Sequence, residues 1–243
     1  MTVLHLADEG EAADLAAFLS RLLHYDRSAA VRLQAAGTAL AVFGRPPSFE
    51  VLAVRTVRLS KPYENGLDAT LDVTVSAGEL LESVDERAAT ARVPGAVTGP
   101  PWAGVLPPRG GWRAEPGLPA PDALRALVAA AVAEFRARTE ELAAEDRTRA
   151  ALDGIGRDIW SRTVGDTGLP VRAVHAAQSL GFLRPRGASG PGTGTGTVTG
   201  IGTGSGEDAP RLFSSGAWLR LRTPFGSVAL RRAGTGALGI SVR

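Results

Sequence analysis

Four polar side chains near the C-terminus share one side of a short predicted helix. Segment 168–183 has Pro170 near its start and Gly181 near its end, which indicates a helix that begins and ends there. At about 3.6 residues per turn, one side of this helix is apolar and the other is polar. Arginine and glutamine can make paired hydrogen bonds with the edges of guanine and adenine. The polar row is Arg172, His175, Gln178 and Ser179, and the apolar side is Val171, Val174, Ala177 and Leu180.

Segment 217–232 is the second candidate binding element. Two alternating runs joined by Pro-Phe-Gly predict a β-hairpin. Because successive side chains of a strand point to opposite sides, Leu219 and Leu221 are expected on one side and the basic residues on the other. Guanidinium groups suit phosphate oxygens. The candidate phosphate contacts are Arg220, Arg222 and Arg231.

The order of a helix, a Leu-Gly-Phe-Leu exit and a basic ribbon resembles the end of a winged helix-turn-helix domain. The resemblance covers residues 145–232, in which a predicted helix at 147–162 would support the reading helix. It implies binding of double-stranded DNA, with the polar row in the major groove and the ribbon arginines on phosphates. Segment 163–168 is too short for the extra helix that usually precedes the reading helix, so the supporting helices would come from upstream.

Two other hypotheses remain open. Modules of this shape also serve as protein–protein or dimer interfaces, which would make the chain a non-catalytic interaction protein. An enzyme with a site of arginines and carboxylates in the first domain is the third hypothesis. DNA binding is favoured if the polar row and the ribbon arginines share one open face. Contact of the polar row with the rest of the protein would count against it.

Other chemistry is weakly represented in the sequence. His5, His24 and His175 lie on different predicted elements and have no partner at metal-ligand spacing. The chain has no cysteine, so thiolate nucleophiles, disulfides and Cys-ligated zinc are excluded. Asp68 and Asp72 share a strand face but are expected about 13 Å apart, too far for one ion. We therefore predict no cofactor and no metal site, and we favour a non-catalytic protein.

Charge is unevenly distributed along the chain. The net charge is +2, but nine arginines and two acidic residues occur from Pro170 onward, giving +7 there and −5 in the first 169 residues. A basic end on an acidic body is typical of proteins that contact nucleic-acid backbones. Lys61 is the only lysine among 27 basic residues, which indicates a GC-rich genome of the actinobacterial kind. No apolar segment is long enough to span a membrane, so we expect a cytoplasmic regulatory or accessory protein.

The remaining pattern predicts an α+β fold whose first domain, residues 1–92, is an antiparallel sheet backed by a helix. Asp8 is a candidate N-cap of that helix, and Ser76 has the spacing of a capping box. Short links and alternation predict a meander. Strands are predicted at 2–6, 31–35, 40–43, 49–59 and 67–76.

Residues 93–121 are rich in proline and glycine, and we predict a strap that packs across the first domain or between domains. The alternative is a partner-binding loop with Trp102, Arg109 and Trp112 as contacts. Residues 122–243 are the predicted second domain. It comprises a long linking helix capped by Asp122, the winged-helix-like module and a Gly/Thr-rich insertion at 187–210. An apolar stripe on the long helix suggests pairing with a second copy.

Overall fold

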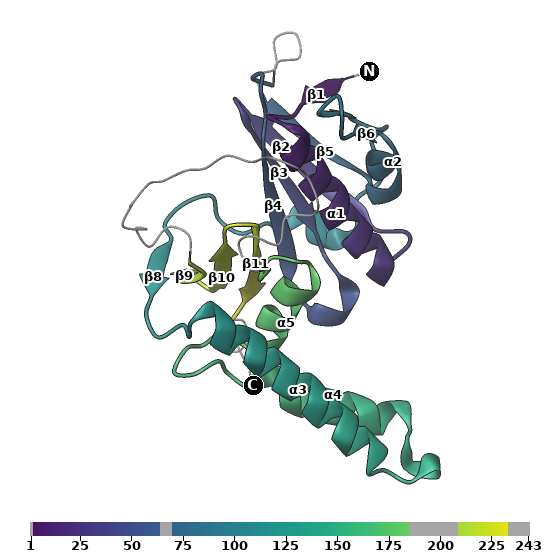
Figure 1. Ribbon diagram of the computed structural model, residues 1–243, viewed down its shortest axis with the longest axis vertical. Helices are drawn as coiled ribbons and strands as arrows, with labels where there is room; N and C mark the ends of the chain where they lie inside the picture. The colour runs from purple at the N-terminus through teal and green to yellow at the C-terminus, as the bar shows by residue number, and fades with distance from the viewer. Residues whose placement is uncertain (1, 64–69, 185–208, 233–243) are drawn as a thin grey trace, which may run out of the picture.

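The centre of the molecule is an antiparallel sheet of eight strands in the order β5-β2-β3-β4-β11-β10-β9-β8 (Figure 1). This computed structural model describes residues 2–63, 70–184 and 209–232. A second sheet of three short strands, in the order β1-β7-β6, lies at the N-terminal end. The predicted α+β class is confirmed for the described residues. Asp68 and nearly all of the Gly/Thr-rich insertion lie outside them.

The N-terminal elements form close to the predicted positions. The Asp8 carboxylate accepts a hydrogen bond from the Glu11 backbone N–H at 2.8 Å, which confirms the predicted N-cap of α1 (Glu9–Tyr25). The apolar side of α1 is fully buried against the sheet. The other elements here are β1 (Val3–His5), β2 (Ala30–Ala36), β3 (Ala39–Gly44), η1 (Pro47–Phe49), β4 (Leu52–Arg58), β5 (Thr70–Ser76), α2 (Ala77–Glu82), β6 (Val84–Asp85) and β7 (Thr90–Arg92).

The strand order departs from the predicted meander at β5, which pairs with β2 instead of β4. The reason is that the far edge of β4 is already occupied by β11 (Gly226–Arg231), with Ala53 opposite Val228. An edge buried in the sheet must have its backbone N–H and C=O groups paired, and β11 supplies that pairing. The outer edge of β5 is covered in part, because the Val97 N–H donates to the Thr74 carbonyl at 2.9 Å.

The C-terminal hairpin is present, but it is not the free wing that the resemblance implies. β10 (Trp218–Thr223) pairs with β11 on one side and with β9 (Arg211–Ser215) on the other, and β8 (Arg113–Glu115) ends the sheet. Leu219 and Leu221 are buried in the same core as the apolar side chains of α1. Both halves of the chain therefore build one sheet and one continuous core.

The long linking helix ends at Glu140, before the helix predicted at 147–162 begins. α3 (Pro121–Glu140) is followed by η3 (Ala144–Asp146), α4 (Arg149–Ser161) and α5 (Val171–Ser179). The prediction that Asp122 caps α3 is wrong. Ala120 is the N-cap residue, and no side chain caps the helix. Pro121 occupies the first helical position, where a missing N–H costs nothing, and the N-cap therefore lies two residues upstream of the predicted one.

α3 and α4 form a helical hairpin that projects from one end of the sheet (Figure 1). Leu124, Val128 and Ile159 are buried where α3 meets α4 and α5. The apolar stripe that suggested pairing with a second copy is therefore in contact with the same chain. Arg162, at the end of α4, pairs across the hairpin with Glu134 of α3 at 2.6 Å and within its own helix with Asp158 at 3.0 Å. The hydrogen bonds from Arg162, and to a smaller extent the contact with Arg138, lower the pKa of the Glu134 carboxyl. No helix in the described ranges is both long and apolar enough to cross a membrane.

The proline-rich segment that follows β7 crosses the face of the sheet opposite α1. It contains η2 (Pro101–Gly104), and Trp102 packs on Phe43, Leu52 and Val54 in a small second core. Arg32 of β2 donates a hydrogen bond to the Ala103 carbonyl. We call this side of the sheet the outer face and the side that packs on α1 and α5 the inner face.

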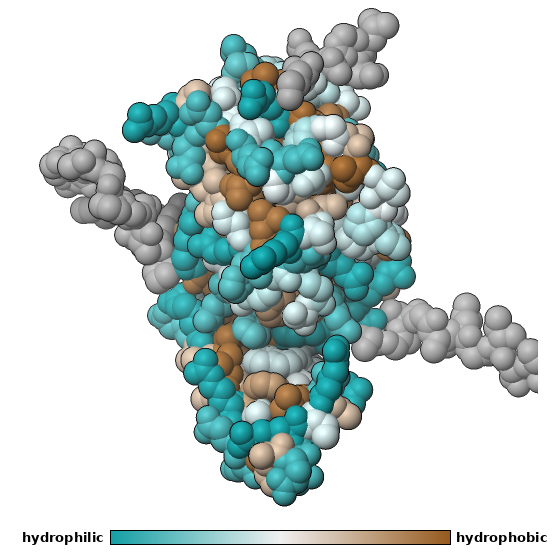
Figure 2. All heavy atoms as spheres, turned by 90° about the vertical axis from the view of Figure 1, so that its right-hand side faces the viewer, coloured by the Kyte–Doolittle hydropathy of each residue, from teal (hydrophilic) through white to brown (hydrophobic). Residues whose placement is uncertain are grey.

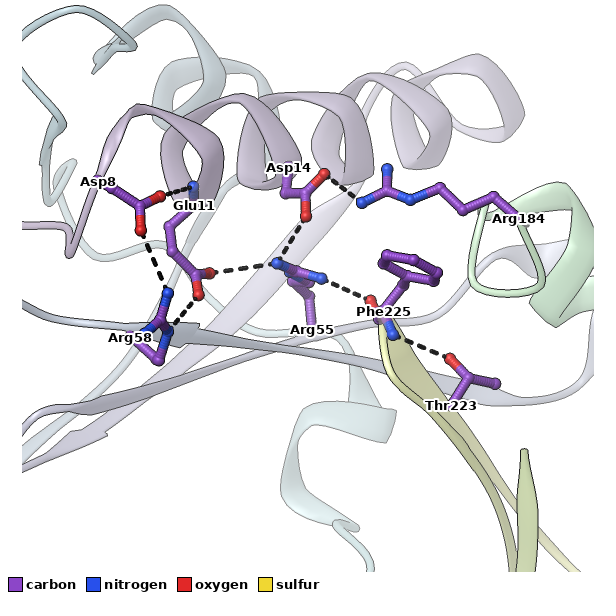
Figure 3. A network of polar contacts seen from close by, with 8 residues as sticks. All are labelled: Asp8, Glu11, Asp14, Arg55, Arg58, Arg184, Thr223 and Phe225. Atoms are coloured by element: carbon purple, nitrogen blue, oxygen red, sulfur yellow. Dashed lines mark hydrogen bonds and ion pairs between the residues drawn. The ribbon is translucent and has the colours of Figure 1, made fainter. Parts of the chain in front are cut away.

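A partly buried network of ion pairs, centred on the buried Arg55, ties the two halves together beside α1 (Figure 3). Arg55 of β4 donates to Glu11 at 3.2 Å and to Asp14 at 3.0 Å, and its other terminal nitrogen donates to the Phe225 carbonyl at 2.8 Å. Arg184, which follows α5, reaches Asp14 at 2.6 Å and stacks over the Phe225 ring. The network joins α1, β4 and the β10–β11 turn at one point.

Candidate functional site

Two members of the predicted polar row of α5, Arg172 and His175, are half-buried against other elements. Arg172 forms an ion pair with Glu50 at 3.5 Å, next to η1. His175 stacks on Trp160 of α4 with ring centres 4.6 Å apart and meets the edge of Phe49 at 5.1 Å. Burial lowers the pKa of His175 and so favours the neutral imidazole. Of the other two members, Gln178 is exposed and Ser179 is half-buried.

The ribbon arginines lie on the other side of the sheet. α5 packs on the inner face, where Leu219 and Leu221 are buried. Arg220 and Arg222 alternate with these leucines and therefore project from the outer face, as predicted from the two-residue period. Arg231 pairs with Trp218 across the hairpin and shares that face. The expectation that the polar row and the ribbon arginines form one surface is wrong, because the sheet itself separates them.

The outer face of β9, β10 and β11 instead carries arginines interleaved with aromatic rings. Each of three guanidinium groups lies over a ring: Arg211 over Phe213 at 5.4 Å, Arg231 over Trp218 at 5.4 Å and Arg220 over Trp112 at 5.8 Å. Such contacts hold the guanidinium plane in place. We call this surface the arginine–aromatic face. Its members are Trp112, Arg211, Phe213, Trp218, Arg220, Arg222 and Arg231.

Positive charge is crowded on this face. Arg211 and Arg222 are directly opposite each other on neighbouring strands. Like charges in that position destabilise a strand pair, by roughly 0.2–1 kcal/mol. Arg220 has a lowered pKa, mainly because it is buried and also because Arg222 is near. Within the described ranges none of Arg211, Arg220, Arg222 and Arg231 has an ion-pair partner, although Arg220 donates to the Ser227 hydroxyl at 3.0 Å.

The predicted interaction loop divides between two places. Trp112 reaches the arginine–aromatic face, and its indole N–H donates to the Pro108 carbonyl at 3.0 Å. Trp102 packs on the other half of the sheet and is half-buried there. Arg109 is exposed, and its charge helps to lower the pKa of Asp72, after the larger effects of Arg32 and Gln34. Only Trp112 joins the ribbon arginines in the candidate site.

Three residues of the arginine–aromatic face were not among the site residues predicted from the sequence. Trp218 lies in the predicted hairpin but was not among the candidates, and Arg211 and Phe213 follow the Gly/Thr-rich stretch, where no strand was expected. The signal was present in the alternation of Arg211, Leu212 and Phe213, which puts the leucine inside and its neighbours outside.

The described residues contain no cluster of histidine, aspartate and glutamate that could hold a metal ion. Asp72, one of the two carboxylates considered in the sequence, pairs with Arg32 at 2.7 Å. The site that the geometry offers is therefore a cationic surface on a rigid sheet.

Comparison with known families divides the chain inside the proline-rich segment. Residues 1–104 match the family model of a domain of unknown function (DUF8010), and residues 107–235 match that of a second domain of unknown function (DUF8185). The comparison with curated proteins gave no match. Since the second match covers more than half of the chain, the protein belongs to the DUF8185 family.

Proposed function

We propose that this protein is a non-catalytic nucleic-acid-binding protein of a regulatory or accessory kind, and that it binds through the arginine–aromatic face. The observation that carries the proposal is the set of four guanidinium groups on three adjacent strands without ion-pair partners among the described residues. Two of them face each other across a strand pair. A chain of phosphates would neutralise this charge and release counterions on binding.

The position of the face within the sheet limits how nucleic acid is bound. A two-stranded ribbon can enter a major groove only when its sides are free. Here β11 is paired with β4, and β10 is paired with β9. The double-stranded DNA implied by the winged-helix resemblance would therefore be contacted along its phosphates, with little reading of base edges. Half-buried aromatic rings between the arginines favour a single strand, whose bases can stack on them.

An acidic protein partner is the second candidate, and one observation favours it. Three of the guanidinium groups already lie over the three rings of the face, which leaves less ring surface for bases. An acidic peptide would need only the guanidinium groups, through paired hydrogen bonds to its carboxylates. In that case the protein is an interaction module of a larger complex.

Fluorescence anisotropy with labelled oligonucleotides over a series of salt concentrations tests the first candidate. We expect single-stranded DNA to bind more tightly than duplex. For the Arg211→Ala/Arg222→Ala variant, the salt dependence of binding to single-stranded DNA should fall by about 1.4 in log–log slope, or about 0.7 per lost contact. Because the variant also relieves repulsion, its thermal stability should be unchanged or higher, so that lost binding cannot be ascribed to unfolding.

Two control variants sharpen the result. Arg136→Ala removes an exposed arginine from α3, far from the sheet face, and should leave binding unchanged. Arg172→Ala should also leave it unchanged, because Arg172 lies on the inner side. Equal loss in the Arg136 variant would mean nonspecific attraction by net charge. Loss only in the Arg172 variant would support a helix-based DNA site and contradict the proposal. An unchanged slope for the double variant would leave the acidic partner as the better candidate.

A further inference from the structure

A cleft on the opposite side of the sheet lies between the helical hairpin and η1. Its volume is about 600 Å³, within the usual range for small-molecule sites. Figure 2 shows the side of the molecule on which the hairpin projects, with apolar and neutral residues between rows of hydrophilic ones at its lower end. Among the residues that line the cleft are Glu50, Phe135, Gly156, Arg157, Trp160 and Arg172.

The aromatic wall of the cleft is held rigidly. Trp160 stacks on His175 at an interplanar angle of 26°, and His175 in turn meets Phe49 edge-on at 88°. Phe135 of α3 lies beside Trp160, with ring centres 6.3 Å apart. One side of the indole is therefore fixed by protein, and the ring presents the rest of its surface to the cleft. A planar ring can stack on such a surface.

Gly156 keeps this surface clear. It lies in the interior of α4, where glycine costs about 1 kcal/mol relative to alanine and where the helical backbone does not require it. A Cβ atom at this position would be 3.5 Å from the Trp160 ring, in ordinary contact with it. The glycine is therefore unnecessary for packing. Its effect is to leave space in front of the indole.

The charged groups of the cleft lack some of the hydrogen-bond and ion-pair partners that they could have. The Arg172 Nε atom is buried and has no hydrogen-bond partner among the described residues, since the Glu50 carboxylate at 3.5 Å forms an ion pair only. Glu50 has a φ of 52°, a left-handed conformation that is unusual and strained for this residue type. Arg157 is exposed on the same side of α4, without an ion-pair partner in the described part of the chain. Backbone strain and an orphaned donor at one place are typical of binding sites.

We infer that this cleft binds a small planar anion, an aromatic ring that carries a phosphate or carboxylate group. The ring lies against Trp160 in the space left by Gly156. The anionic group accepts hydrogen bonds from Arg172 and Arg157 and competes with Glu50 for the first of them. This site is separate from the arginine–aromatic face, and the inference does not depend on nucleic-acid binding there.

Isothermal titration calorimetry of the full-length protein with adenosine 5′-monophosphate and with indole-3-acetate tests the inference. The two probes distinguish a phosphate from a carboxylate as the anionic group. Adenosine and inorganic phosphate test the ring and the anionic group of adenosine 5′-monophosphate separately. We expect at least one of the two probes to bind with Kd below about 1 mM and both separate parts to bind more weakly.

Three variants locate the binding. Arg172→Met should weaken it by about tenfold or more through loss of a charged hydrogen bond, and Gly156→Leu should abolish it by filling the space before the indole. Arg222→Ala, on the outer face, should leave it unchanged. A thermal melt shows whether each variant is folded, and leucine raises helix propensity at a helical glycine. No binding of either probe, or full binding by both cleft variants, would overturn the inference.

Discussion

The imidazole of His175 illustrates how one buried residue makes stability depend on pH. Burial lowers its pKa in the folded protein below the ordinary value of about 6.5, while the unfolded chain keeps the ordinary value. The contribution of His175 is therefore complete above about pH 6.5 and is lost as the pH falls from there toward the lower folded pKa. We expect His175→Phe, which keeps an aromatic ring on Trp160, to remove this decline. Urea unfolding at about pH 7.5 and about pH 5.5 measures it.

His24→Phe is the matched control for that experiment, since His24 is exposed near the end of α1. Its unfolding free energy should change with pH as the wild type does. If the wild type and the His175 variant lost equal stability between the two pH values, the imidazole would not be the group responsible.

The strand period was enough to predict the side on which Arg220 and Arg222 lie. It could not predict that Arg172 and His175 are enclosed, because the residues that enclose them come from η1 and α4. Phe49 and Glu50 are more than 120 positions away in the sequence, and nothing in the local pattern of α5 indicates contact with them. A helix with one polar side has the same sequence pattern whether that side faces solvent or packs against another element.

At the scale of elements, the β10–β11 turn is fixed by its contact with the end of α5. Gly226 has a φ of 153°, and a Cβ atom there would be 2.5 Å from the ring of Phe182. That ring is buried and stacks on Phe18 at 5.7 Å, so it cannot move away easily. We expect Gly226→Ala to lower the unfolding free energy by about 2 kcal/mol through overpacking. Chemical denaturation measures the change.

Gly216 in the β9–β10 turn supplies the comparison. It has a φ of 53° but no heavy atom within 4 Å of a Cβ atom at that position. Gly216→Ala therefore carries backbone strain without a clash and should cost about 1 kcal/mol. If the two variants lost the same stability, the contact with Phe182 would contribute nothing beyond the backbone effect.

Most helices and strands were predictable because their signals are local. Asp8 as a cap, the alternation of β5 and the Pro-Phe-Gly turn each act within a few residues. Their pairing was not predictable, since β11 and β4 are separated by about 170 residues and either strand could have been an edge. The same limit applies to the candidate site, because Trp112 meets Arg220 only after β8 has joined the far end of the sheet.

At the scale of the whole molecule, the regions matched by the two family models share a sheet, a core and the Arg55 network. Proteins built around one continuous core usually unfold in one cooperative step. Three of the four tryptophans lie in the second matched region, whereas α1 and the first four strands of the large sheet lie in the first, where Trp102 packs on Phe43 and Leu52. Tryptophan fluorescence and far-ultraviolet circular dichroism therefore report differently on the two halves. We expect their urea transitions to coincide.

Substitution of Arg55 should shift the unfolding transitions seen by both probes to the same extent. Its side chain is 8% exposed and donates to Glu11, Asp14 and the Phe225 carbonyl, so Arg55→Met leaves three acceptors short of a partner. We expect a loss of about 2 kcal/mol or more, seen equally by both probes. Arg58→Met, which removes a 70% exposed partner of the same Glu11, should cost much less because water replaces the lost contact. Separate transitions in the Arg55 variant would instead show two halves that fold independently and are held together only by this network.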